Sequence, residues 1–125
     1  MKKKIFLAED DEDDALFFTQ AVSELSLDIS LTILCNGDKL IKQLEKHDVL
    51  PDIIFLDLNM PLKDGLECLR EIKTHSLWKA IKIIMLSTTS DKAQIAKCYS
   101  LGADIFVTKA PNFNIFKLNL EACLL

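Results

Sequence analysis

The chain has few residues of the kinds that interrupt regular structure: only three of its 125 residues are glycine and three are proline. It also has no dense Lys/Arg stripe and carries a net charge of −4, which argues against nucleic-acid binding. No apolar run approaches the length of about 20 residues that spans a membrane. The apolar stretch Ile5 to Ala8 is too short for the core of a signal peptide. We therefore expect a soluble, cytoplasmic protein that binds neither nucleic acid nor membrane directly.

Close cysteine pairs are also missing. The sequence has four cysteines, Cys35, Cys68, Cys98 and Cys123, and no C-x-x-C pair. Neither a zinc site nor a redox motif is indicated by this spacing. Buried, reduced thiols are the expectation.

Acidic charge, by contrast, is concentrated in one place. Six of the 19 acidic residues are consecutive, from Glu9 to Asp14, which leaves 13 acidic against 15 basic side chains elsewhere. Half of the residues are apolar, and the length suits a single domain with a packed core. The net acidity of the chain therefore belongs to one short segment.

Short apolar runs alternate with segments of helical length. Continuous hydrophobicity within such runs is typical of strands that are covered on both faces, as in a parallel sheet. Four runs have this character: residues 5–8, 53–56, 83–86 and 105–107. A fifth and more mixed run, Leu31 to Leu34, is expected at an edge of the sheet.

The segments between these runs have helical periodicity. The predicted apolar faces are Ala15, Phe18, Val22 and Leu25; Leu66, Leu69 and Ile72; and Ile95, Ala96 and Tyr99. Gly102 follows the fourth helix as a residue that ends it, and residues 112–125 form a fifth helix, apolar on more than one side. Five β-α repeats predict an α/β domain, most economically a flavodoxin-like three-layer sandwich with a parallel sheet of order 2-1-3-4-5.

Polar residues stand where the predicted strands end. Glu9 and Asp10 follow the first strand, Asp57 ends the third, Ser87 ends the fourth, and Lys109 follows the fifth. These ends lie on one edge of a parallel sheet, and ligands bind there at the crevice where the strand order reverses. We expect three carboxylates, a hydroxyl and an ammonium group to converge at that crevice.

This set of groups has a specific chemistry. Crowded carboxylates repel one another unless a cation joins them, and an all-oxygen cluster suits Mg²⁺. An aspartate flanked by Mg²⁺, Lys109 and the hydroxyl of Ser87 is well placed to attack phosphorus. The residues therefore predict that Asp57 accepts a phosphoryl group. For Asp11 to Asp14 we prefer a simpler role as a solvated acidic cap on the first helix.

Several motifs together resemble the receiver domain of two-component response regulators over essentially the full length of the chain. Their order and spacing carry the resemblance, which is greatest to small stand-alone receivers that partner phytochrome-type kinases. The motifs are residues 5–10, 56–65 (including Pro61 and Leu62), 86–88, 102–104 and 108–109. The resemblance implies one receiver domain, 1–125, with no output domain.

The resemblance also implies roles for individual residues. Asp57 would be phosphorylated by a histidine kinase or phosphotransfer protein, and Lys109 would contact the phosphate. The Mg²⁺ ligands would be Glu9, Asp10, Asp57 and the backbone carbonyl of Asn59. Ser87 and Phe106 would form a switch pair, and Asn59 and Thr89 would influence the lifetime of the phosphorylated state. The protein would be a switch rather than a metabolic enzyme.

The chain departs from the family pattern after Lys109. Receivers usually place a proline there, after a cis peptide bond, whereas here Ala110 intervenes before Pro111. A cis bond before alanine costs about 3 kcal/mol, yet we expect Lys109–Ala110 to be cis so that the lysine keeps its direction. Phe106 also lacks the hydroxyl group that other residues supply at the switch position.

One face of the apolar final helix must cover the sheet. Its other apolar residues either pack into the core or form an exposed patch that marks an interface. Receivers use the face formed by helix 4, strand 5 and helix 5 for output. We accordingly predict self-association or partner docking there.

Two other classes of protein fit less well. A haloacid-dehalogenase-type phosphatase needs D-x-D, where this chain has Asp57-Leu58-Asn59. A flavodoxin needs phosphate-binding Ser, Thr and Gly after the first strand, where this chain is acidic.

Overall fold

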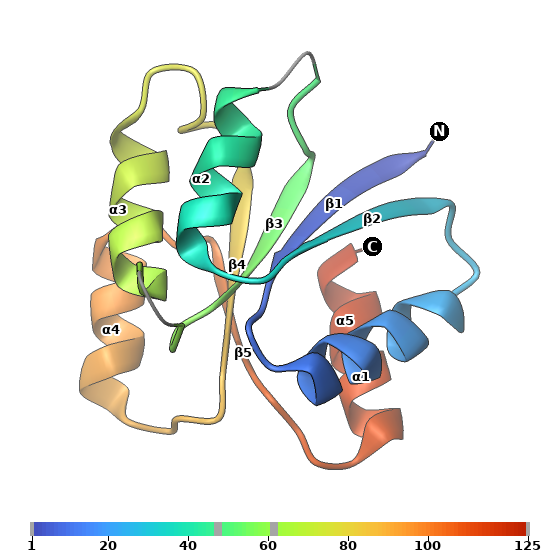
Figure 1. Ribbon diagram of the computed structural model, residues 1–125. Helices are drawn as coiled ribbons and strands as arrows, with labels where there is room; N and C mark the ends of the chain where they lie inside the picture. Colours follow the sequence, from blue (N-terminus) through green and yellow to red (C-terminus); the bar gives the residue numbers. More distant parts are fainter. Residues whose placement is uncertain (1, 47–48, 61–62, 125) are drawn as a thin grey trace.

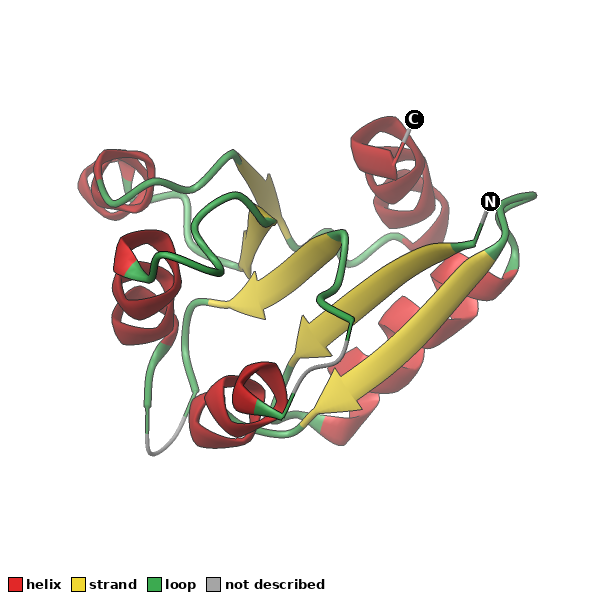
Figure 2. Ribbon diagram, turned by 90° about the horizontal axis from the view of Figure 1, so that it is seen from above, coloured by secondary structure: helices red, strands yellow, loops and turns green. Residues whose placement is uncertain are grey.

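The computed structural model describes residues 2–46, 49–60 and 63–124 and forms a three-layer α/β sandwich (Figures 1 and 2). Of the residues named above, Pro61, Leu62 and Leu125 lie outside the described part. The strands are β1 (Lys3–Ala8), β2 (Ile29–Leu34), β3 (Ile53–Asp57), β4 (Lys82–Ser87) and β5 (Ile105–Thr108). The helices are α1 (Glu12–Ser23), α2 (Gly37–Glu45), α3 (Gly65–Thr74), α4 (Lys92–Ser100) and α5 (Phe113–Leu124).

All strand pairs are parallel, and the order is β2-β1-β3-β4-β5, so the predicted flavodoxin-like topology is confirmed. β2 is an edge strand with only Leu34 buried, as its mixed composition indicates. Reversal of the strand order at β1 and β3 opens the crevice between their carboxyl ends.

The sheet separates two apolar cores, because successive side chains of a strand point to opposite faces. In β1, Ile5 and Leu7 face α1 and α5, whereas Phe6 and Ala8 face α2, α3 and α4. β3 and β4 alternate in the same way. Covering both faces explains why these strands are continuously apolar rather than alternating.

A short polar side chain begins each helix by accepting a hydrogen bond from a backbone N–H of the first turn. These capping residues are Asp11, Asn36, Asp64, Asp91 and Asn112. Gly102 ends α4 at a positive φ of 107°, which a residue with a side chain adopts at a cost. The predicted helix end at Gly102 is therefore confirmed.

The helical faces are predicted unequally well. Phe18 and Val22 of α1, and Leu69 and Ile72 of α3, are buried as expected. The predicted face of α4 is wrong: Ala96 and Tyr99 are exposed, and Cys98 is the only buried residue of that helix. α4 packs against the edge strand β5 with one buried residue, so this helix needs no full apolar stripe.

The cysteines are mixed rather than uniformly buried. All four are free; Cys68 and Cys98 are buried, Cys123 is half-buried, and Cys35 is exposed. The expectation of burial is therefore wrong for Cys35, which lies just beyond the end of edge strand β2. No helix in the part of the chain that the structure describes is long and apolar enough to cross a membrane.

Candidate phosphoryl-acceptor site

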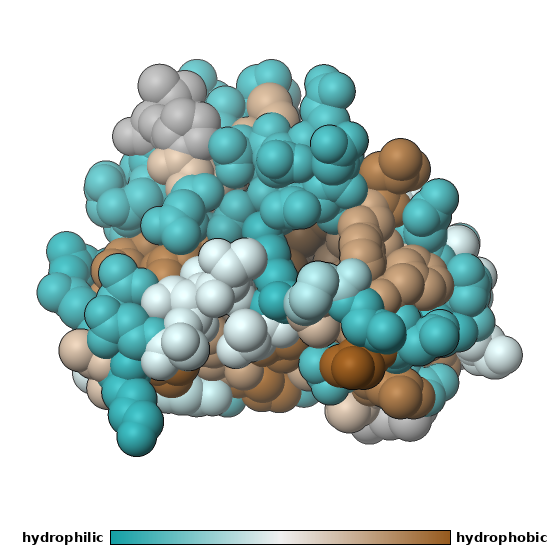
Figure 3. Space-filling model, turned by 90° about the horizontal axis from the view of Figure 1, so that it is seen from below, coloured by the Kyte–Doolittle hydropathy of each residue, from teal (hydrophilic) through white to brown (hydrophobic). Residues whose placement is uncertain are grey.

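Strand register brings the predicted site residues together. Ala8 pairs with Leu56, so the residues that follow them, Glu9 and Asp57, lie side by side where the two strands end. On the next strands Asp57 pairs with Leu86, and Ser87 pairs with Thr108. All of these residues therefore meet at the carboxyl end of the sheet. Figure 3 shows the molecule from this side, with many hydrophilic residues and with apolar residues visible between and below them.

Three carboxylates form the acidic part of the site. One oxygen each from Glu9, Asp10 and Asp57 lies within 4.8 Å of the others. Glu9 and Asp57 are buried, at 3% and 5% exposure, whereas Asp10 is exposed. Burial of charge without a partner is costly, so two buried carboxylates side by side require either a cation or a proton on one of them.

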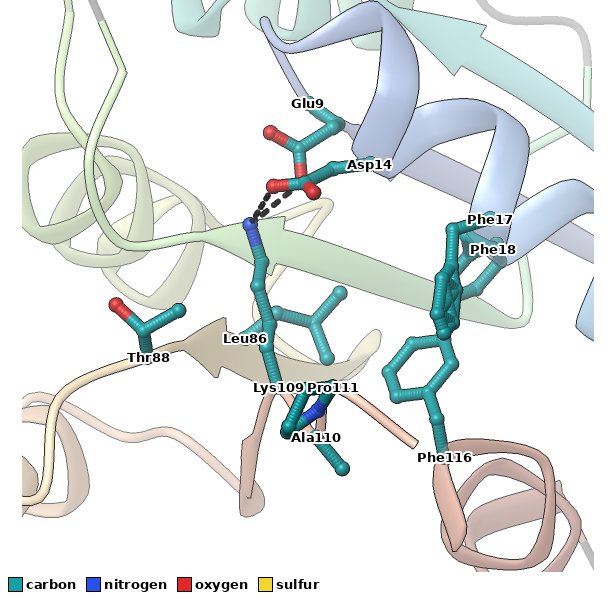
Figure 4. Close-up of a pocket in the computed structure, with 10 residues that line it drawn as sticks. All are labelled: Glu9, Asp14, Phe17, Phe18, Leu86, Thr88, Lys109, Ala110, Pro111 and Phe116. Carbon is teal, nitrogen blue, oxygen red and sulfur yellow. Dashed lines mark hydrogen bonds and ion pairs between the residues drawn. The ribbon is translucent and has the colours of Figure 1, made fainter. Parts of the chain in front are cut away.

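Lys109 supplies one positive charge to this cluster. Its Nζ lies 2.7 Å from Glu9 Oε1, 2.9 Å from Asp14 Oδ2 and 3.4 Å from Asp57 Oδ2. Figure 4 shows the side chain running from β5 to the start of α1, with Glu9 and Asp14 at its end. Lys109 thus pairs with three carboxylates, and Asp10 lies beside two of them, so negative charge exceeds the positive charge among the site residues that the structure describes.

The electrostatic conflict appears in the pKa of Glu9, which is raised to about 8. Burial is the main cause, and the neighbouring Asp57 carboxylate adds to it against the opposing effect of Lys109. For Lys109, burial acts to lower the pKa, but hydrogen bonds to Glu9 and Asp14 outweigh it and raise the pKa above its ordinary value. Lys109 is therefore protonated.

Excess negative charge and the all-oxygen donor set fit a divalent cation such as Mg²⁺, as the sequence predicts. Glu9, Asp10 and Asp57 come from two adjacent strand ends, so the sheet itself holds them close. A cation here would relieve the repulsion that raises the pKa of Glu9.

Backbone contacts hold the Asp57 segment in place. The N–H of Asn59 donates to Asp57 Oδ1 over 3.2 Å, and the N–H of Leu58 donates to the carbonyl of Leu86. Gly65 packs so closely that a Cβ there would lie 2.7 Å from Leu58 Cα and would clash with the carbonyl oxygen of Asp57. A side chain at position 65 would therefore push α3 away from the site.

Ser87 and Phe106 occupy neighbouring strands. Ser87 is buried, and its Oγ accepts a hydrogen bond from the N–H of Thr89 over 3.1 Å. Phe106 is half-buried and packs against the core shared by α2, α3 and α4. Its backbone N–H donates to the phenol oxygen of Tyr99 over 3.0 Å.

The expected cis bond at Lys109–Ala110 is wrong, because every peptide bond across residues 2–46, 49–60 and 63–124 is trans. The lysine still reaches the site, since its N–H donates to the carbonyl of Ser87 over 2.7 Å and its long side chain supplies the rest of the span. Ala110 and Pro111 instead line a cavity of about 440 Å³ between α1 and α5, together with Phe17 and Phe116 (Figure 4).

Two residues near the site were not predicted from the sequence. The sequence predicts a solvated cap at Asp14, but its carboxylate pairs with Lys109, and Asp11 is the residue that caps α1. The periodicity predicts a core position for Tyr99, but its hydroxyl accepts a hydrogen bond from β5. In neither case did residue type alone signal the contact, because both depend on how a helix lies against the sheet.

Comparisons with known proteins agree with this geometry. Residues 5–119 match the family described as response regulator receiver domain. The chain is 31% identical over 122 residues to response regulator Rcp1 of Synechocystis sp., covering 93% of this chain and 83% of that protein. It is 30% identical over 98 residues to chemotaxis protein CheY of Listeria monocytogenes, covering 78% of this chain and 81% of that one.

Solved structures give the same result. A phosphorylated cyanobacterial phytochrome response regulator, RcpA, matches with a TM-score of 0.90 and 30% identity, over 98% of this chain and 91% of that chain. Mn²⁺-bound Rcp1 matches with a TM-score of 0.86 and 29% identity, over 96% and 90% of the two chains. The predicted likeness to receivers of phytochrome systems is confirmed by these relatives. Family match, topology and strand-end chemistry agree, and this chain belongs to the response regulator receiver domain family.

Proposed function

We propose that Asp57 accepts a phosphoryl group from the phosphohistidine of a sensor histidine kinase or phosphotransfer protein. An oxygen of the Asp57 carboxylate attacks phosphorus, the P–N bond breaks, and the imidazole leaves with the bonding electron pair. The observation that carries this proposal is a buried carboxylate, 5% exposed, with an ammonium group 3.4 Å away and two further carboxylates beside it. Such a site positions a nucleophile and neutralises charge, which are the main requirements of phosphoryl transfer.

Lys109 and Ser87 would stabilise the phosphoryl oxygens. Lys109 now lies closer to Glu9 and Asp14 than to Asp57, so its flexible side chain would turn towards a phosphoryl group and form a new ion pair. The Ser87 hydroxyl would donate a hydrogen bond to a phosphoryl oxygen while still accepting one from the N–H of Thr89. Ser87 and Phe106 would then act as the switch pair.

Glu9, Asp10, Asp57 and the backbone carbonyl of Asn59 would hold Mg²⁺, which supplies charge neutralisation when bound. The chain's own contribution is to keep these oxygens on two rigid strand ends. Hydrolysis would follow when water attacks phosphorus and releases phosphate and the Asp57 carboxylate. Asn59, which follows β3, and Thr89, which follows β4, would influence that rate.

Output would pass through the face formed by α4, β5 and α5. Ile115 and Leu118 of α5 are exposed at 53% and 61%, whereas Phe116, Leu120 and Leu124 are buried. α5 is therefore apolar on two sides, and the outer side is available for self-association or for a protein partner. A cytoplasmic setting, shared with a kinase, fits this role.

Incubation with acetyl phosphate and Mg²⁺, followed by intact-mass measurement, tests the proposal. The expected result is the addition of one phosphoryl group, lost in Asp57→Asn and on chelation of the metal. Asp52→Asn is the matched control, because Asp52 lies at the opposite end of the sheet. Labelling that persists in Asp57→Asn would overturn the assignment.

A further inference from the structure

α4 is held to the rest of the molecule by few contacts. Its single buried residue is Cys98, whereas each of the other four helices buries at least three residues. Helices with little buried area are the elements that shift or open most readily. The position of α4 therefore depends strongly on its individual polar contacts.

One contact lies near the carboxyl end of the helix. The hydroxyl of Tyr99 accepts a hydrogen bond from the N–H of Phe106 over 3.0 Å. β5 is an edge strand, so this N–H points away from β4 and has no strand partner. Tyr99 itself is 47% exposed, which shows that its ring is not held by core packing.

A second set of contacts lies at the amino end. The N–H of Thr89 donates to Ser87 Oγ, the N–H of Asp91 donates to Thr89 Oγ1, and the N–H of Ala93 donates to Asp91 Oδ1. These bonds of 2.8 to 3.1 Å form a continuous chain from the buried hydroxyl at the site to the first turn of α4.

Both connections lead back to Ser87. The carbonyl of Ser87 accepts the N–H of Lys109 over 2.7 Å, and this bond ties the end of β4 to the end of β5. A displacement of Ser87 towards a phosphoryl group would therefore pull α4 at its amino end directly, and at its carboxyl end through β5 and Tyr99. Phe106 has no hydroxyl of its own, so its backbone is the only part that can form this polar link.

We propose that Tyr99 is a positioning residue that couples phosphorylation of Asp57 to the position of α4, by holding the helix to β5 at Phe106. This inference rests on the proposed function, since the displacement begins with the phosphoryl group. The Tyr99 hydroxyl thus forms the polar contact between α4 and β5 that the Phe106 side chain, which has no polar atom, cannot form.

Tyr99→Phe tests the inference, because it keeps the exposed ring and removes only the hydroxyl. Ser100→Ala is the matched control, because its hydroxyl donates to the carbonyl of Lys97 within α4 rather than to β5. Both variants are expected to take up a phosphoryl group from acetyl phosphate as the unmodified protein does.

The decisive measurement is amide hydrogen exchange with and without beryllium fluoride and Mg²⁺, which mimic the phosphoryl group. In the unmodified protein and in Ser100→Ala, beryllium fluoride should change exchange across α4 by about threefold or more. In Tyr99→Phe the Phe106 amide should exchange about tenfold faster, and the response of α4 should fall to less than about half.

The outcomes separate the two proposals. Phosphoryl uptake combined with an unchanged α4 response in Tyr99→Phe would overturn the role of Tyr99 alone. Equal loss of the response in Ser100→Ala, or faster exchange in Tyr99→Phe without a smaller response, would also overturn it, since both indicate a structural effect only. Failure of the unmodified protein to take up a phosphoryl group would overturn the proposed function and, with it, the signal that Tyr99 transmits.

Discussion

The two ends of the sheet both carry charged residues, but they use them differently. At the amino end Lys3, Lys4 and Lys82 each donate from Nζ to a backbone carbonyl, and Asp52 accepts the N–H of Lys4. At the carboxyl end the ammonium of Lys109 pairs with three carboxylates, two of them buried, and Asp10 adds a fourth carboxylate beside these two. The charged residues at the amino end form hydrogen bonds with backbone groups of the chain, whereas the carboxylates at the carboxyl end repel one another. Burial of these carboxylates and the repulsion between them raise the pKa of Glu9 to about 8, even beside Lys109, which indicates a site made for an external cation.

The largest contrast should come from a matched pair of lysines. Lys109→Met removes the ammonium group that pairs with the buried Glu9 and Asp57, and should lower the free energy of unfolding by about 3 kcal/mol. Lys82→Met removes a lysine that donates to the carbonyl of Cys123 rather than to a buried carboxylate, and should cost about 1 kcal/mol or less. Urea unfolding of metal-free protein measures both values. Equal decreases in the free energy of unfolding would show that lysines at the two ends of the sheet contribute equally to stability.

A matched pair of aspartates should give effects of opposite sign. Asp57→Asn removes one of the mutually repelling charges and should raise the free energy of unfolding of the metal-free protein by about 1 kcal/mol. Asp52→Asn weakens the acceptor of the Lys4 N–H and should lower it by about 1 kcal/mol. Thermal unfolding without metal distinguishes the two variants. A destabilised Asp57→Asn would mean that the repulsion is already relieved within the chain.

The pH dependence of metal binding provides a smaller but more specific effect. The pKa of Glu9 is raised from 4.5 to about 8, so this residue favours the folded state below about pH 4.5 and loses that contribution as the pH rises towards 8. Mg²⁺ requires the deprotonated carboxylate and must displace its proton at lower pH. The increase in melting temperature caused by Mg²⁺ should therefore be about 3 °C or more larger at pH 8.5 than at pH 6.

Glu9→Gln is the control for this effect. It should reduce the stabilisation by Mg²⁺ and remove most of its dependence on pH, because the titrating group is gone. Asp14→Asn alters another ion-pair partner of Lys109 but keeps Glu9, and it should leave the pH dependence of the Mg²⁺ effect in place. If the increase in melting temperature caused by Mg²⁺ still depends on pH in Glu9→Gln, a group other than Glu9 is responsible.

The sequence predicts those features of the fold and the site that depend on which strands are buried in the sheet. Continuous apolar strands predict the parallel sheet, and Asp57 at the end of the most apolar strand predicts the site. Features that depend on local geometry at the edge are less predictable. The contacts of Tyr99 and Asp14, the exposure of Cys35 and the trans bond before Ala110 follow from how single residues meet their neighbours, which composition and periodicity do not encode.

The sparse packing of α4 has a consequence for the evolution of the protein. Seven of its nine residues are exposed, so most of its surface can change without disturbing either core. The site residues, in contrast, are set by strand register and tolerate little change. With the proposed output face and the proposed role of Tyr99, selection can therefore alter which partner recognises this helix while the phosphoryl chemistry stays the same, provided that the polar links to Ser87 and Phe106 are kept.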